Sequence, residues 1–255
     1  MKPDLRGLVV PSGLLVAAEA VMRANNVQSD ALAPPTDVAV ALWHAVADGS
    51  IWLSSGQTLW AALAGLALGG GLGLLMGIWL GLSRRAAQAS TLSVELLRPV
   101  PSVALIPLSM LVFGFGSGME IAVVSFTCFW PMLILTQAAI RQVEPRLLEV
   151  AHMLGFSPLA RVGKIILPAA MPRIFVAFRL SVGIALVVGV TVEIAANPQG
   201  LGYALMNAQQ SLRPDLMFAL VLWIGLMGWS VSASLLALQR YWFRHSLSDA
   251  SRGQS

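Results

Sequence analysis

The sequence is poor in charge. Asp, Glu, Lys and Arg make up 11% of its 255 residues, whereas a soluble domain carries roughly 25%. So few charges cannot cover a folded surface in water, which excludes an ordinary soluble domain. Hydrophobic residues reach 57% of the chain and the mean hydropathy is +0.77. This composition predicts an all-α polytopic membrane protein.

Residues for several kinds of chemistry are also scarce. Cys128 is the single cysteine, so a disulfide within the chain and CxxC redox chemistry are excluded. The three histidines fall in different predicted segments, and no HExxH or paired-carboxylate spacing occurs, so we expect no metal or hydrolytic site. The phosphate-binding pattern GxxxxGK[ST] is missing too, because Gly163-Lys164 is followed by Ile165. The chain therefore has no ATPase motif of its own.

Long apolar runs are what the sequence has instead. A helix that crosses a bilayer needs about 20 mostly apolar residues. A weaker run at 7–22 contains Pro11 and Glu19 and could be either a retained span or a cleaved signal peptide, since Ala18-Glu19-Ala20 resembles a cleavage site. The other predicted spans are 58–82, 99–116, 119–140, 174–196 and 216–239.

The distribution of Lys and Arg predicts the orientation of these six spans. With the N-terminus inside, 13 of the 16 basic residues, Arg98 among them, fall on the cytoplasmic side, two fall outside, and Arg179 lies within a span. Cytoplasmic loops are the ones enriched in Lys and Arg. Both termini and the segment 144–168 are therefore predicted to be cytoplasmic.

The second predicted span carries a glycine at every fourth position. Such a stripe lies along one face of a helix and lets another backbone approach closely. Packing within the chain is the favoured interpretation, and a contact between subunits is the alternative. The helix-packing glycines are Gly65, Gly69, Gly73, Gly77 and Gly81.

The third predicted span is rich in helix-breaking residues. Pro99, Pro101 and Pro107 lie in its first half, and glycines recur at its end. Proline is tolerated in a bilayer where neighbouring groups or water satisfy the freed carbonyls. We therefore expect a kinked helix, which either borders a pathway or serves only the packing of the bundle.

The segment 147–168, LLEVAHMLGFSPLARVGKIILP, interrupts the apolar runs with charged residues. Pro145 suits a first helical turn and Gly155 a helix end, while Ser157-Pro158 suits the start of a second helix that Leu167-Pro168 would stop. Leu147, Leu148, Ala151 and Leu154 can share one side of the first helix. A helix–turn–helix is predicted here, and an ordinary amphipathic loop over the helix ends remains an alternative.

The same residues resemble a known family. Glu149-Val150-Ala151, three residues, Gly155, nine residues and Ile165-Ile166-Leu167-Pro168 are similar to the cytoplasmic signature of ABC-importer permeases, Glu-Ala-Ala-x3-Gly-x9-Ile-x-Leu-Pro. Val150 is the single departure from that pattern.

The resemblance implies the type I importer fold and a role for this segment. Glu149, Val150 and Ala151 would lie on a coupling helix that docks on a separate ATPase. Gly155 would form the turn, and Ile165, Leu167 and Pro168 would anchor the segment to the bundle. The implied assembly has two ATPase subunits that bind ATP and Mg, a substrate-binding protein outside, and two copies of this chain or a pair with a paralogue. The implied location is the bacterial inner membrane.

Further stretches resemble the permeases for sulfonates, taurine and nitrate. They are the residues from Leu97 to Leu108, the run Glu193-Ile194-Ala195-Ala196, and the run Gly200-Leu201-Gly202-Tyr203. Arg98 resembles the cytoplasmic residue that precedes the third span in these permeases; anchoring is the favoured role, and substrate contact is the alternative. Glu193, Asn197 and Pro107 are candidates for pathway or gate lining, and for Glu193 a structural hydrogen bond to the following turn is the alternative.

These inferences divide the chain into three parts. An N-terminal helix and external loop occupy 1–50, an ABC transmembrane domain with the coupling segment 144–168 occupies 51–245, and a cytoplasmic tail occupies 246–255. The predicted function is a permease that imports a small, anionic solute. Its rivals are a secondary transporter or channel without an ATPase, and an intramembrane enzyme, for which no polar constellation is evident.

Overall fold

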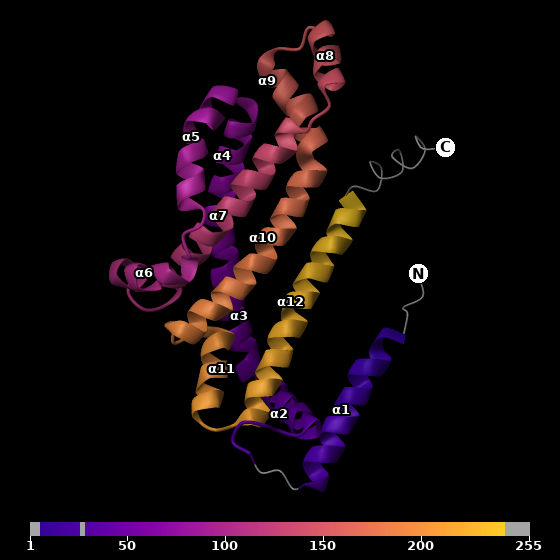
Figure 1. Ribbon diagram of the computed structural model, residues 1–255, viewed down its shortest axis with the longest axis vertical. Helices are drawn as coiled ribbons and strands as arrows, with labels where there is room; N and C mark the ends of the chain where they lie inside the picture. The colour runs from indigo at the N-terminus through magenta and orange to yellow at the C-terminus, as the bar shows by residue number, and fades with distance from the viewer. Residues whose placement is uncertain (1–5, 26–28, 243–255) are drawn as a thin grey trace.

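The computed structural model describes residues 6–25 and 29–242, and the predicted tail 246–255 lies outside them. All regular elements in this part of the chain are helical, as predicted (Figure 1). In chain order they are α1 (Arg6–Ala24), α2 (Pro35–Ala47), α3 (Ser50–Gly65), η1 (Leu66–Gly70), α4 (Gly71–Leu82), α5 (Arg84–Leu97), η2 (Ser102–Leu105), α6 (Ile106–Phe113), α7 (Ser117–Arg141), α8 (Pro145–Met153), α9 (Pro158–Arg161), η3 (Val162–Ile166), α10 (Leu167–Ala195), α11 (Gly200–Gln210) and α12 (Pro214–Trp242).

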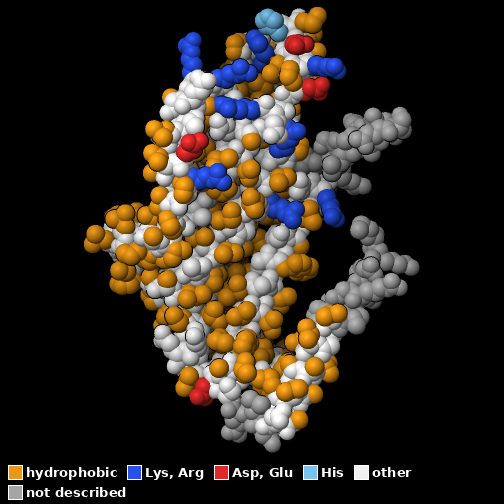
Figure 2. Space-filling view, viewed as in Figure 1, with side chains coloured by type: hydrophobic (Ala, Val, Ile, Leu, Met, Phe, Trp, Pro, Cys, Tyr) orange, Lys and Arg blue, Asp and Glu red, His pale blue; other side chains and the backbone are white. Residues whose placement is uncertain are grey.

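Within residues 6–25 and 29–242, four continuous helices are long and apolar enough to cross a membrane. They are Ser50–Leu82, Ser117–Arg141, Pro158–Ala195 and Pro214–Trp242, and each contains most or all of one predicted span. We call the end of the bundle that carries α8 and α9 the inner end, because it is predicted to be cytoplasmic. The opposite end is the outer end. Lys and Arg side chains gather toward the inner end, while hydrophobic side chains cover much of the rest of the visible face (Figure 2).

The third predicted span is not one kinked helix. The helical segments 84–97 and 102–113 are together long and apolar enough to span a membrane, but the chain bends by 80° between them. Pro99 and Pro101 lie in the connection and have no backbone N–H to continue the helix. The prediction of a span over 99–116 is therefore wrong in its bounds, because the helix breaks at the prolines and α6 projects sideways from the bundle (Figure 1).

The glycine stripe packs within the chain. A Cβ atom at Gly65 would lie 2.6 Å from Val124 Cβ, and one at Gly77 would lie 2.6 Å from the Leu133 carbonyl oxygen. At Gly69 a Cβ would overlap the backbone of Ser125. Gly73 and Gly81 face α7 in the same way, so the whole stripe lets α3, η1 and α4 lie directly against α7.

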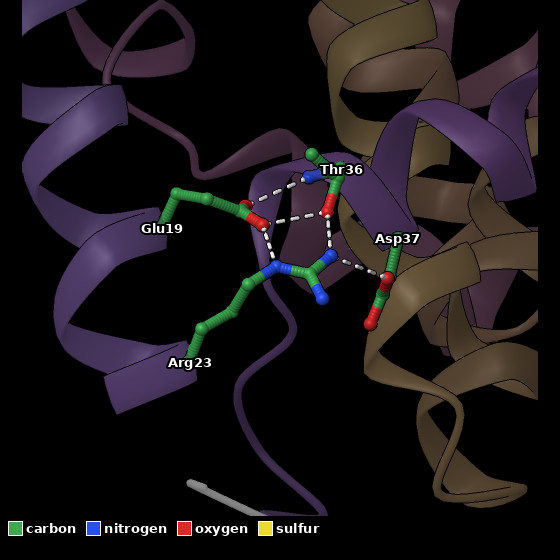
Figure 3. A network of polar contacts seen from close by, with 4 residues as sticks. All are labelled: Glu19, Arg23, Thr36 and Asp37. Atoms are coloured by element: carbon green, nitrogen blue, oxygen red, sulfur yellow. Dashed lines mark hydrogen bonds and ion pairs between the residues drawn. The ribbon is translucent and has the colours of Figure 1, made fainter. Parts of the chain in front are cut away.

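The N-terminal helix α1 stands apart from the long helices and contacts α2 (Figure 1). By length and composition it is not one of the candidate membrane spans found among the described residues. Glu19 accepts hydrogen bonds from the backbone N–H of Thr36, at 3.0 Å, and from the Thr36 hydroxyl, at 2.7 Å. Arg23 bonds both Glu19 and Thr36 and lies 3.7 Å from Asp37 (Figure 3). This network joins α1 to the first turn of α2.

Candidate functional site

The segment 144–168 forms the predicted pair of helices at the inner end (Figure 1). The first helix, α8, begins at Pro145 and is closed by Gly155, whose φ of 69° lies in the left-handed region. The N–H of Gly155 donates to the His152 carbonyl at 3.0 Å, and that of Phe156 to the Ala151 carbonyl at 3.1 Å. This bond pair is a Schellman motif, which fixes the direction of the chain after α8.

The second helix begins as predicted but does not stop where predicted. Ser157 caps α9, because its hydroxyl accepts from the N–H of Ala160 at 3.3 Å, and Pro158 occupies the first turn. Through a π-helical stretch, η3, the chain then enters α10, so that Pro158–Ala195 runs as one helix. The prediction that Leu167-Pro168 ends the helix is wrong, because the π-helical stretch directly before Leu167 changes the hydrogen bonding there and carries the helix past Pro168.

Exposed side chains on α8 and α9 form a surface at the inner tip. Glu149 and Val150 are exposed, and Met153 and Leu159 are 86% and 85% exposed. Ala151 is fully buried and faces the body of the protein. We call Glu149, Val150, Met153, Leu154 and Leu159 the tip surface.

The predicted apolar side of α8 is therefore only partly correct. Ala151 is buried and Leu148 half-buried, but Leu147 and Leu154 are exposed. Leu154 lies outside because the helix ends one residue earlier and the chain turns there.

The proposed anchors of the segment have different environments. Leu167 packs against the buried cluster of Ala139, Ile140 and Ala170 at the inner ends of α7 and α10. Ile165 is half-buried, whereas Pro168 is exposed. Leu167 is thus the predicted anchor that joins the segment to the bundle.

A second group of polar residues lies at the outer end, where α11 begins. The first N–H groups of a helix have no partner within it. Here the N–H of Gly200 donates to Gln57 Oε1 at 3.0 Å, and that of Leu201 to Thr58 Oγ1 at 3.0 Å. The N–H of Gly202 donates to Glu193 Oε2 at 2.8 Å. Side chains of α3 and α10 therefore cap α11.

The loop between α10 and α11 is also tied to α7. Asn197 donates its side-chain amide to Glu120 Oε2 at 2.7 Å. Glu120, Glu193 and Asn197 are 1%, 2% and 3% exposed. We call Gln57, Thr58, Glu120, Glu193 and Asn197 the outer polar cluster. It connects four separate elements of the bundle.

Glycine is required where this cluster is tightest. Gly200 has a φ of 88°, and a Cβ atom there would overlap the Glu193 carboxyl group. A Cβ at Gly202 would lie 2.7 Å from Glu193 Cβ. The Gly-Leu-Gly sequence thus allows the helix start to approach the buried acid.

Of the three residues predicted to line a pathway, two lie in one cluster and the third lies apart from it. Glu193 and Asn197 belong to the outer polar cluster, and Glu193 bonds the following turn. Pro107 is exposed on α6. Sequence reasoning missed Glu120, Gln57 and Thr58; for Glu120 the signal was present, since it is an acid inside a predicted span.

The comparisons with known proteins agree with this arrangement. Residues 69–245 match the family described as binding-protein-dependent transport system inner membrane component. The aliphatic sulfonates transport permease protein SsuC of Bacillus subtilis (strain 168) is 31% identical, over 92% of this chain and 86% of its own. The taurine transport system permease protein TauC of Escherichia coli (strain K12) is 28% identical, over 76% of this chain and 70% of its own.

A solved structure shares the fold. The crystal structure of an amino acid ABC transporter with histidines aligns with a TM-score of 0.60 at 16% identity, and covers 80% of this chain and 97% of its own. The architecture is therefore that of an ABC-importer transmembrane domain. The chain belongs to the family of binding-protein-dependent transport system inner membrane components, and it is a transporter permease subunit of the membrane.

Proposed function

We propose that this chain is the membrane-spanning subunit of an ATP-driven importer, located in the bacterial inner membrane with both termini inside. Six spans, with α1 as the first, would contribute half of a pathway, and a second copy of the chain would complete it. Two ATPase subunits would bind ATP and Mg, and a substrate-binding protein would deliver the solute from outside. The working domain would be 51–245, with 1–50 and 246–255 as flanking parts.

One observation carries the proposal: the tip surface is exposed, apolar and acidic, and it is held on a rigid support. Exposed Met and Leu side chains in a group are typical of a protein–protein contact. The Schellman turn and the Ser157 cap restrict the movement of α8 relative to α9. A displacement of the tip by a partner would therefore be passed on to α10.

Alternating access follows from this arrangement. Closure of the ATPase pair would bring the two tip surfaces together and open the pathway outward, where the outer polar cluster would separate or rearrange. Hydrolysis would return the pathway to the inward-facing state. The solute we propose is a small organic anion of the sulfonate or taurine kind, or nitrate, on the basis of relatives with those substrates in their names.

The test is reconstitution with the ATPase and the binding protein. Glu149→Ala and Gly155→Ala should weaken association with the ATPase and reduce ATP-dependent uptake. Each has a matched control: Glu95→Ala removes an exposed acid from α5, and Gly163→Ala changes a glycine with open space and an ordinary φ. Glu149 is exposed and unstrained, so its variant separates docking from folding.

Three results would contradict the proposal. Uptake without any ATPase, driven by an ion gradient, would favour a secondary transporter or channel. Chemical turnover by the purified chain alone would favour an enzyme. Normal ATPase association of both Glu149→Ala and Gly155→Ala would remove the coupling role of the segment.

A further inference from the structure

The break between α5 and α6 forms one wall of an open cleft, in which several lining residues are exposed in the isolated chain. A cavity of about 350 Å³ is lined by Arg98, Val100 and Ser102 from this connection and by residues of α7 and α10. The α7 residues are 126–135, in the middle of the 117–141 helix, and the α10 residues are Leu180 and Ile184, near the middle of theirs. The cleft therefore lies at mid-depth of two membrane spans.

Arg98 does not lie where the sequence pattern suggests. It was expected to anchor the inner end of a span, yet it lines a cavity with residues from the centre of α7. The reason is that the bent pair of helices begins with α5 at Arg84, whereas the predicted span began at Pro99. The chain has therefore already run the length of α5 when it reaches Arg98. An ionisable residue at membrane depth is costly and marks a functional site by default.

The charge of Arg98 is uncompensated in the described residues. No acidic residue lines the cavity. Within residues 6–25 and 29–242, Arg98 forms no ion pair, and Glu95, one helical turn earlier, does not pair with it. The Arg98 side chain is exposed in the isolated chain, so its guanidinium can donate charge-assisted hydrogen bonds to an anion that enters the cleft. Irregular backbone at this depth is likewise tolerated only where it is buried in protein or lines a water-filled cavity.

The remaining walls are mostly apolar. Phe126, Trp130 and Ile134 of α7 and Ile184 of α10 line them, and the hydroxyl of Thr127, which also lines the cleft, donates to the Val123 carbonyl. Ser102, half-buried at the start of η2, adds a hydroxyl near the Arg98 side. The lining of the cleft thus combines a cationic group and hydroxyls with aromatic and aliphatic groups.

We propose that this cleft is a transient binding site for the transported solute, and that it selects an organic anion with an apolar chain over a bare inorganic anion. Arg98 binds the anionic head, with Ser102 as a second donor, and Phe126 and Ile134 contact the carbon chain. The inference rests on the proposed import function and specifies the substrate class at one site. Nitrate would satisfy the guanidinium but would leave the apolar wall uncovered.

Direct binding to the reconstituted transporter, without the binding protein, tests the site. The probes are methanesulfonate, butanesulfonate and hexanesulfonate, with nitrate and butylammonium for comparison, measured by saturation-transfer NMR. Affinity should rise up to about fourfold per added methylene, since each buried methylene contributes a near-constant free energy. Butylammonium should not compete.

Two variants separate the two sides of the cleft. Arg98→Gln should weaken every sulfonate by about tenfold or more, whereas Arg98→Lys should keep part of the affinity. Phe126→Ala should reduce the dependence on chain length and leave methanesulfonate binding nearly unchanged. Arg85→Gln is the control, because Arg85 is exposed and lies outside the cleft.

The outcomes distinguish this site from the import function itself. If the wild-type transporter lacks ATP-dependent uptake, the proposed function fails. If it transports, and Arg98→Gln and Phe126→Ala retain wild-type affinity and chain-length dependence, the site is overturned. If Arg98→Gln also loses ATPase association, Arg98 acts on assembly and the site is likewise overturned.

Discussion

Asn197 donates a hydrogen bond to Glu120 across 77 residues of sequence and so ties the loop after α10 to the outer part of α7. Both groups are buried, so neither can exchange this bond for water without opening the bundle. Glu193 of α10 likewise holds the start of α11, because its carboxyl group accepts from the N–H of Gly202. The outer end is therefore held by a few specific polar contacts among apolar helices.

Removal of the Asn197 amide should destabilise this end. Asn197→Ala leaves Glu120 Oε2 without its donor, and an unsatisfied buried polar group costs roughly 1–3 kcal/mol. We expect a lower apparent melting temperature of the detergent-solubilised protein. Asn207→Ala, at an exposed position of α11, should leave the melting temperature unchanged. Equal effects of the two substitutions would contradict the role of Asn197.

The glycine stripe gives a sharper comparison within one span. Gly69→Ala places a methyl group on the Ser125 backbone and must separate η1 from α7, which should cost about 1–3 kcal/mol or more. Gly71→Ala, two residues later, meets open space and should be neutral or slightly stabilising. Thermal unfolding followed by size-exclusion fluorescence measures both. A harmless Gly69→Ala would show that the two helices are not in close contact.

Val150 offers a test of the tip surface, on the basis of the proposed function. Its side chain is exposed, so Val150→Ala should not change the stability of the chain alone. It should change the affinity for the cognate ATPase, because the missing methyl groups belong to the contact surface. Titration of the purified ATPase onto the permease measures the effect. Ala151→Val is the opposite case, since Ala151 is fully buried and the larger side chain should destabilise the fold.

The start of α3 should respond to acid. Asp48 Oδ1 accepts from the N–H of Ser50 at 2.9 Å and from its hydroxyl at 2.7 Å. These bonds hold the pKa of Asp48 below its ordinary value of 3.8. A lowered pKa stabilises the folded state fully above the unfolded pKa, and the contribution disappears as the pH falls through the folded pKa.

Hydrogen exchange of residues 49–54 measures this effect. Protection of the Ser50 amide should fall as the pH decreases from about 5 to about 2.5, beyond the intrinsic change in exchange rate. Asp48→Asn should show no such additional loss. If the native protein and Asp48→Asn follow the same pH profile, the carboxylate does not support the start of α3.

The features that sequence reasoning predicted correctly are those set by local pattern. The four-residue glycine repeat determined a helix face, and that face does pack within the chain. Gly155, Ser157 and Pro158 determined a turn and a cap, because each residue type has a strong backbone preference. The family resemblance was confirmed by the match over residues 69–245.

The features that it missed depend on distant contacts. Gln57 and Thr58 are ordinary polar residues in a helix until α11 folds back to place its first N–H groups beside them. The helix end expected at Pro168 fails for a related reason. The ring of a proline clashes only with the helical turn before it. At Pro168 that turn is the π-helical stretch η3, whose different hydrogen bonding avoids the clash. Arg98 was predicted at a membrane edge because the residues next to it in the sequence do not show that α5 already forms part of the span.

The continuity of Pro158–Ala195 has a mechanical consequence. At about 1.5 Å per residue, an unbroken helix of 38 residues extends over nearly 60 Å. Its inner end adjoins the tip surface, and its outer end carries Glu193. If this helix tilts about its middle as one rod, its two ends move in opposite directions. Opening at one side of the membrane and closing at the other would then be a single motion, and a simultaneous leak through both ends would require the rod to break.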